Sequence, residues 1–358
     1  MSLPVNLTSH AVGYEIGYDL AGRWQIVVVA KASYQWTRDG AIAPTTPLPL
    51  LDRDQLDGDL PHGGPVRPSD LGSPKPKVDV VLAGALRFPV AIDRVDVRLQ
   101  VGQRIDKTAR VFGDRVWVPG FAADAVPSTP KPTTRISIRW EQSFGGADPD
   151  DPRTLDRRNP VGCGLAAKAE SLHGKPVPSF EDPSDEIASW KSRPAPVGFG
   201  PLASHWLPRA ELAGTYDKAW RRDRFPFPPA DLDARFFNVA PPDQQLDAYQ
   251  PGEEVRLTYM SEHGHDRFQL PDFTAPITIV TSEDFVEDVA TVDTIVIEPE
   301  EHRLSLTARV SAPLHPGPEA LRHIVVGNLT RGLRSALERG KDHVLLHAPR
   351  ANGRGART

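Results

Sequence analysis

Residues 24–36 read "WQIVVVAKASYQW", a run that is dense in β-branched and aromatic side chains. These residue types favour strands because they pack well on a pleated, half-buried surface. Gly22 precedes the run and the pair Asp39-Gly40 follows it, and glycine and aspartate are turn residues. The stretch therefore predicts a β-strand that is followed by a turn.

Further runs along the chain show the two-residue period of half-buried strands. Polar and apolar residues alternate in 77–87, "KVDVVLAGALR", and in 94–101, "RVDVRLQV". In 107–120, "KTARVFGDRVWVPG", two such runs flank Gly113-Asp114 and predict a hairpin. Strand-like runs resume between residues 253 and 310, with a hairpin turn predicted at Glu300-Glu301. These patterns predict antiparallel sheets.

The proline content limits the fold class. The chain of 358 residues has 37 prolines, about twice the average frequency, and a proline inside a helix removes a hydrogen bond and clashes with the preceding turn. A mainly helical architecture is therefore excluded. We predict a mainly β fold of antiparallel, sandwich-like sheets, with a long ordered irregular central segment and a C-terminal amphipathic helix.

The same patterns divide the chain into five parts. We expect an N-terminal antiparallel β region over 1–145, a loop-rich segment over 146–243, a second β region over 244–313, a helix within 314–340 and a basic tail over 341–358. The helix is expected because apolar residues from Leu321 to Leu337 recur at steps of three and four. One continuous domain over 1–340 is the alternative.

Charge and composition exclude several functional classes. The chain has a net charge of −5, so it lacks the excess of lysine and arginine that nucleic-acid binding needs. No window approaches the ~20 apolar residues of a membrane span, and no signal peptide is recognised at the N-terminus. A single cysteine, Cys163, excludes an internal disulfide framework. A cytoplasmic protein is expected, and the sequence specifies no oligomeric state.

Few residues suggest catalysis. Cys163 lies in the glycine-rich "GCGLAA" of residues 162–167, where a small side chain in a turn is the favoured interpretation. His263 and His265 lie in "EHGHDR", between two predicted strands, and a solvated hairpin turn is favoured there. No cofactor or metal is expected. The alternative is a metal-dependent hydrolase that uses His263, His265 and Asp243.

The loop-rich segment contains the densest aromatic cluster, "GFGPLASHWLPRAELAGTYDKAWRRDRFPF" at residues 198–227. Protein interfaces are enriched in tryptophan, tyrosine and arginine because these side chains bury a large area for little lost entropy. The candidate partner-binding residues are Trp206, Arg209, Tyr216 and Trp220. Two alternatives are a satellite core under a long loop, and a carbohydrate-binding module that stacks sugars on Trp206, Tyr216 and Trp220.

Several segments resemble the bacterial domain-of-unknown-function family 2169 (DUF2169). They run collinearly from about Gly22 to Pro271 and include "GRWQIVVVAKASY", "SDLGSPKPKVDVVLAGAL", "WEQSFGG", "PVGFGPLASHWLPRAELAGTYDKAW" and "RFPFPPADLDARFFNVAPPDQQ". The resemblance implies a non-enzymatic adaptor or chaperone. Its partners would be a cognate type VI secretion effector or PAAR-type tip protein, which it helps to load on the VgrG spike. The family supplies no catalytic residues to carry over.

Overall fold

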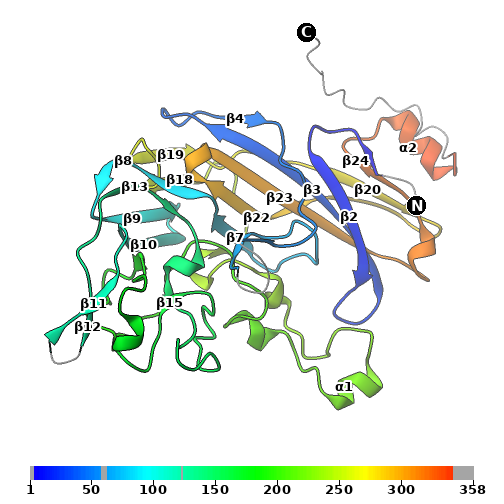
Figure 1. Ribbon diagram of the computed structural model, residues 1–358. Coiled ribbons are helices and arrows are strands. Elements are labelled where there is room, and N and C mark those ends of the chain that lie inside the picture. Colours follow the sequence, from blue (N-terminus) through cyan, green and yellow to red (C-terminus); the bar gives the residue numbers. More distant parts are fainter. Residues whose placement is uncertain (1–3, 58–62, 122–123, 342–358) are drawn as a thin grey trace, which may run out of the picture.

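The computed structural model describes residues 4–57, 63–121 and 124–341, and the predicted basic tail lies outside these residues except for Lys341. The described chain is mainly β, with several antiparallel sheets and two α-helices, which confirms the predicted fold class (Figure 1). The helices are α1 (Lys218–Asp223) and α2 (Arg331–Glu338). None of the described helices is long and apolar enough to cross a bilayer.

The largest sheet has seven strands and is built around the stretch quoted first. That stretch forms β3 (Trp24–Trp36), as predicted, and its residues Ile26, Val28 and Ala30 are fully buried. The order in the sheet is β17 (Gln245–Leu246), β7 (Val78–Leu82), β22 (Thr291–Glu298), β23 (Arg303–Pro313), β3 and β2 (Ala11–Tyr18), with β4 (Ile42–Thr45) also paired to β3.

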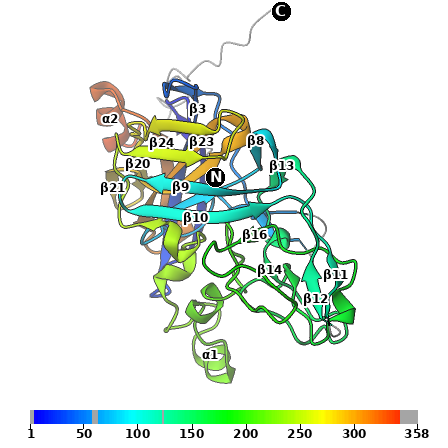
Figure 2. The same cartoon turned by 90° about the vertical axis from the view of Figure 1, so that its left-hand side faces the viewer.

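Two further sheets pack against the same core (Figure 2). The five-stranded sheet has the order β16 (Phe180–Glu181), β10 (Ile105–Phe112), β9 (Arg94–Val101), β18 (Glu254–Thr258) and β19 (His265–Gln269). The four-stranded sheet has the order β1 (Val5–Asn6), β24 (Leu321–Val326), β20 (Pro276–Thr281) and β21 (Phe285–Val289). Buried side chains from all three sheets form one hydrophobic cluster, so the fold has a shared core.

Four small two-stranded sheets complete the scaffold. They pair β5 (Gln55–Leu56) with β6 (Pro65–Arg67), β8 (Ala85–Ile92) with β13 (Thr133–Ser137), β11 (Trp117–Pro119) with β12 (Ala125–Pro127), and β14 (Phe144–Gly145) with β15 (Cys163–Gly164).

The two predicted β regions are interleaved in space. Strand β7 from the first region lies between β17 and β22 from the second, and it runs parallel to β22. Strand β3 pairs with β23 over eleven residues from Arg303↔Gln35 to Pro313↔Gln25. The regions 1–145 and 244–313 therefore contribute strands to the same sheet.

Two local predictions are wrong. Residues 321–326 form strand β24 and not a helix, and only Arg331–Glu338 is helical. Ile324, Val325 and Val326 are all buried because β24 is covered on both faces, and a strand buried in this way loses its alternating pattern. The predicted hairpin at Gly113-Asp114 is absent as well, because β10 pairs with β9 and β16 while β11 pairs with β12.

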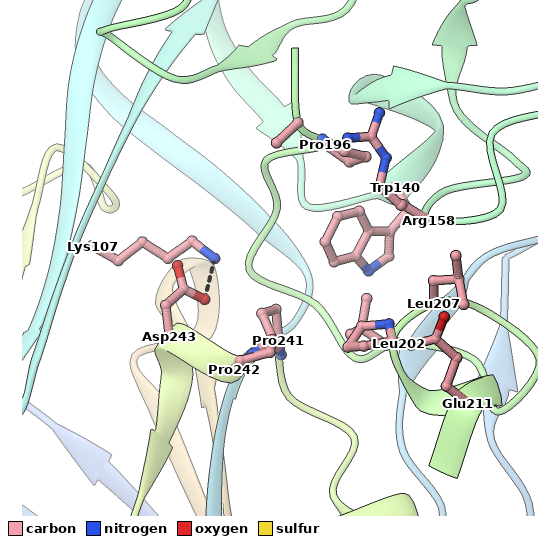
Figure 3. A pocket seen from close by; sticks show the side chains of 12 residues that line it. Lys107, Trp140, Arg158, Pro196, Leu202, Leu207, Glu211, Pro241, Pro242 and Asp243 are labelled. Atoms are coloured by element: carbon pink, nitrogen blue, oxygen red, sulfur yellow. Dashed lines mark hydrogen bonds and ion pairs between the residues drawn. The ribbon is translucent and has the colours of Figure 1, made fainter. Parts of the chain in front are cut away.

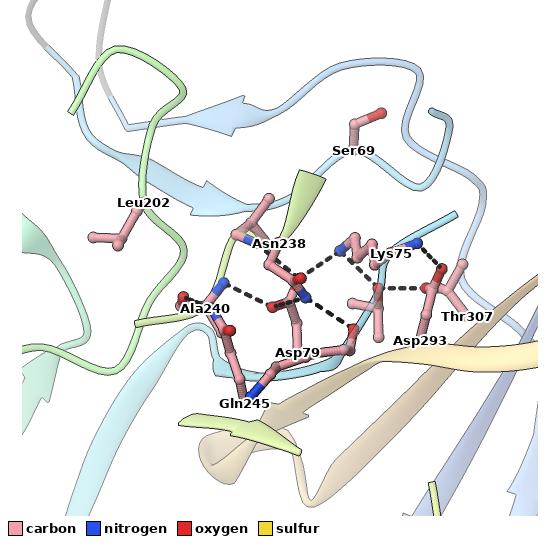
Figure 4. Close-up of polar contacts among 12 residues, drawn as sticks. Ser69, Lys75, Asp79, Leu202, Asn238, Ala240, Gln245, Asp293 and Thr307 are labelled. Carbon is pink, nitrogen blue, oxygen red and sulfur yellow. Dashed lines mark hydrogen bonds and ion pairs between the residues drawn. The ribbon is translucent and has the colours of Figure 1, made fainter. Parts of the chain in front are cut away.

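The irregular central chain is attached to the large sheet through the carboxylate of Asp79 on β7 (Figure 4). Asp79 is fully buried. It accepts hydrogen bonds from the Asn238 side chain (3.0 Å) and from the backbone amides of Val239 (2.8 Å) and Ala240 (3.1 Å). Lys75 balances the charge at 2.8 Å, and its side chain is also buried. Four donors therefore satisfy one buried anion.

A second set of buried, paired charges lies beside the Asp79 group. Asp70 pairs with Lys31 of β3 at 2.7 Å and accepts a hydrogen bond from Thr307. Arg309 of β23 forms an ion pair with Asp293 and donates to the backbone carbonyl of Asp70. Asp293 also accepts from the backbone amide of Lys75. The two groups thus form one chain of buried charges across the sheet.

We predict that Asp79→Ala lowers the free energy of unfolding by about 3–5 kcal/mol, because it leaves the buried Lys75 ammonium without its balancing charge and removes the acceptor of the Asn238, Val239 and Ala240 N–H groups. Urea denaturation monitored by circular dichroism measures the change. The matched control is Asp247→Ala, which removes an exposed carboxylate paired with Lys77 and should change stability by ~0.5 kcal/mol or less. Equal losses of unfolding free energy in the two variants would contradict the role assigned to the buried Asp79 carboxylate.

Candidate partner-binding surface

A pocket of about 410 Å³ opens on the irregular central chain (Figure 3), within the range of about 300–1,000 Å³ that is usual for ligand sites. Its wall is mostly apolar and is formed by Trp140, Leu202, Leu207, Pro196, Pro241 and Pro242. The indole of Trp140 is held in place because its Nε1 donates to the Pro201 carbonyl at 2.8 Å. The pocket therefore has a preformed aromatic wall.

Charged groups stand on two sides of this pocket. Lys107 donates to Asp243 (3.0 Å) and to the Gln244 side chain (2.8 Å). Burial lowers the pKa of Lys107, and the nearby Asp243 carboxylate opposes that shift. On the other side lies Glu211, which is exposed and whose carboxylate has no hydrogen bond or ion pair within the described chain. The rim thus presents one free carboxylate.

Two of the predicted partner-binding residues are buried. Trp206 is 1% exposed and packs edge-on against Trp140, with ring centroids 6.1 Å apart. Arg209 is 8% exposed and donates to the backbone carbonyls of Phe236 and Leu202. Trp206 is therefore not exposed to a partner but fills a satellite core beneath the pocket, which is the alternative interpretation of this stretch. Both residues support the pocket wall indirectly, because Trp206 packs against Trp140 and Arg209 donates to Leu202.

The other two predicted residues lie on a projecting loop, residues 214–231, which we call the aromatic arm (Figure 1). Its base is closed by Asp231, which accepts from the Thr215 amide (2.9 Å) and hydroxyl (2.7 Å). Gly214 has φ +78°, a left-handed conformation that glycine adopts without strain. Arg224 ties the arm to the body by donating to the Leu20 carbonyl at 2.9 Å.

Aromatic rings cover the tip of the arm. Asp217 caps α1, and Tyr216 contacts Trp220 at a centroid distance of 4.7 Å, while Trp220 contacts Phe225 at 5.7 Å. Trp220 is partly buried and donates its Nε1 to the Phe227 carbonyl at 2.9 Å. Tyr216 is 60% and Phe225 is 65% exposed. Of the four candidate residues, Tyr216 is therefore the most accessible to a partner.

The structure separates the residues of the alternative sites. Trp206 is buried while Tyr216 is exposed, so these two rings do not form a shared stacking face for a sugar. Asp243 pairs with Lys107, and His265 contacts the ring of Tyr259. The predicted hairpin between β18 and β19 is confirmed, but His263 in its turn stacks on His302 and is only partly exposed.

Sequence reasoning missed several residues of the surface. Phe225 and Glu211 lie inside the quoted aromatic stretch, but nothing in their spacing separates exposed from buried members. Trp140 comes from a segment about sixty residues earlier in the chain and joins the pocket only through the fold. His302 ends the turn after β22, and the sequence around it contains no recognisable metal-binding or catalytic motif.

The chain belongs to the family described as "Uncharacterized protein conserved in bacteria (DUF2169)", whose model matches residues 21–309. The match covers the three large sheets except for β1, β2, β24 and the last four residues of β23, together with the pocket and the aromatic arm. Comparison with curated proteins and with solved structures gave no match.

The single thiol provides a test of the local packing. Burial raises the pKa of Cys163 to about 12, and the positive charge of Arg115 offsets only part of that shift. The thiolate is the reactive form, so we predict that iodoacetamide alkylates the folded chain at pH 8 roughly a thousandfold more slowly than the urea-unfolded chain. The rate should keep rising up to about pH 11, and a plateau near the ordinary cysteine pKa would contradict this.

Proposed function

We propose that this chain is a non-enzymatic cytoplasmic adaptor that binds a cognate type VI secretion effector or PAAR-type tip protein and assists its loading on the VgrG spike. The proposal starts from family membership and the role that the resemblance implies. The observation that carries it is the aromatic arm, which exposes Tyr216 and Phe225 on a loop that is closed at its base. A surface of this kind suits protein binding.

The chemistry of the arm favours a protein partner. Exposed clusters of large apolar side chains mark interaction sites in soluble proteins. Tyr216 and Phe225 are held by edge contacts to Trp220, so they lose little conformational freedom when they are covered. Arg221 and Arg222 lie exposed on α1 between them. The arm can therefore grip a surface that combines apolar and acidic groups.

The pocket supports the same proposal because it adjoins the arm in the chain. Glu211 at its rim is three residues before Gly214, where the arm begins. An apolar wall beside an unpaired carboxylate fits an apolar side chain of the partner that is followed or preceded by a basic one. We propose that the pocket receives this anchor while the arm covers the adjoining surface.

We predict that the double variant Tyr216→Ala, Phe225→Ala stays folded and loses at least about thirtyfold in affinity, which corresponds to ~2 kcal/mol. The probe is the effector or PAAR-domain protein encoded by the adjoining gene, coexpressed and then titrated in purified form by calorimetry. The control is Val90→Ala, which truncates a 66% exposed side chain on β8, away from the arm.

We predict separately that Glu211→Lys weakens the same complex, because it reverses the free charge of the Glu211 carboxylate at the pocket rim. Glu319→Lys, a change of equal charge at a residue outside the pocket, serves as its control. Normal binding by both the arm variant and Glu211→Lys would remove this surface from the proposal. Binding of glycans, or hydrolytic activity in the purified chain, would favour the alternative functions.

A further inference from the structure

Two hairpin turns from different sheets bring together a cluster of metal-ligand side chains. The turn between β18 and β19 carries Glu262 and His263, and the turn between β22 and β23 ends at His302. One ligand atom from each of these three residues lies within 4.8 Å of the other two. The cluster stands outside the pocket and the aromatic arm, and the proposed function does not use it.

The first imidazole is oriented as metal-binding histidines usually are. The Nδ1 of His263 lies 3.0 Å from the carboxylate of Asp266, and that carboxylate also accepts from the Ser261 hydroxyl. Asp266 is buried and belongs to β19, so its position is fixed by the sheet. A carboxylate on Nδ1 selects the tautomer that leaves the lone pair on Nε2. Nε2 of His263 is therefore the atom available to an ion.

The second imidazole has an unused nitrogen. Nε2 of His302 is buried and makes no hydrogen bond, and its nearest charged group is the Glu262 carboxylate at 3.9 Å. Buried polar atoms without a partner are uncommon because they lose their hydrogen bonds to water. His302 also has a left-handed backbone at φ 47°, which is unusual for a residue other than glycine. A ligand on this nitrogen would satisfy it, whereas the left-handed backbone follows from the position of His302 at the end of the turn.

We propose that Glu262, His263 and His302 bind a divalent transition metal ion of the zinc class, which clamps the five-stranded sheet to the seven-stranded sheet at this edge. Two imidazole nitrogens and one carboxylate oxygen are a ligand set that zinc accepts, with a fourth position left for water. Harder ions such as Mg²⁺ and Ca²⁺ prefer oxygen ligands and fit this set poorly.

Binding requires one local rearrangement. The two imidazole rings are nearly parallel, with an interplanar angle of 9° and centroids 4.6 Å apart. Ligand nitrogens on one tetrahedral zinc ion lie about 3.4 Å apart, and an ion cannot lie in both parallel ring planes. The His302 ring must therefore turn toward the ion. Its Nε2 has no hydrogen bond to break, whereas the bond to Asp266 holds His263 in place.

The test is metal uptake by the full chain, purified without a histidine tag and freed of metal by chelation. Equilibrium dialysis against Zn²⁺ should give one bound equivalent, and Co²⁺ should give the visible absorption of a tetrahedral site. Zn²⁺ should also raise the melting temperature, because an ion that binds only the folded state stabilises it.

Three variants and one matched control locate the site. His263→Ala and His302→Gly should abolish the stoichiometric uptake, and glycine is chosen because it accepts the left-handed backbone of His302. Glu262→Gln alters an exposed side chain, should fold normally, and should weaken binding at least tenfold. His265→Ala removes the neighbouring imidazole, which points to Tyr259 and lies outside the cluster, and it should bind as the unaltered chain does.

The proposal is overturned if the unaltered chain takes up no stoichiometric Zn²⁺ or Co²⁺, or if His265→Ala reduces uptake as much as His263→Ala. It is also overturned if Glu262→Gln folds and binds with unchanged affinity. None of these results tests partner binding, because Glu262, His263 and His302 lie outside both the pocket and the aromatic arm.

Discussion

The buried carboxylate of Asp79 is the constraint on which the partner-binding surface depends. It sits on β7 in the large sheet and accepts two backbone amides and one side-chain amide from residues 238–240, far along the chain. A buried anion is stable only when it is paired and hydrogen-bonded, and Lys75 supplies the balancing charge. Because the sheet and the irregular chain satisfy each other at this point, neither can move away without exposing the charge.

The same principle repeats along the irregular chain. Gln244 donates to the carbonyls of Val80 and Phe199, and Arg209 donates to those of Leu202 and Phe236. In a regular sheet, backbone carbonyls accept hydrogen bonds from the neighbouring strand. Here the Gln244 and Arg209 side chains donate to these carbonyls instead. The consequence is a loop-rich segment with a defined shape, which positions the wall of the pocket and the base of the aromatic arm before any partner binds. Such preorganisation reduces the ordering cost of binding.

The sequence predicted elements whose signals are local and missed those that depend on tertiary contacts. Strand β3 was predicted with its observed bounds because its β-branched run is long and ends at clear turns. Leu321–Val326 was assigned to a helix because a strand covered on both faces has no alternation to detect. Trp206 and Arg209 are buried although both are candidates from the sequence, because composition does not distinguish a buried side chain from an exposed one, whereas the candidate Tyr216 is exposed. The cluster of Glu262, His263 and His302 joins two hairpins, so spacing in the sequence could not reveal it.

The central claim is that the irregular segment is held rigidly on the sheet in the free protein. Hydrogen exchange of the backbone amides of Val239 and Ala240 tests it most directly, since both donate to Asp79 in a segment without strand or helix. The account predicts that these amides exchange as slowly as those in the middle of β3, through opening of the whole core. Exchange at the rate of an exposed loop would contradict it and would mean that the surface forms only when a partner binds.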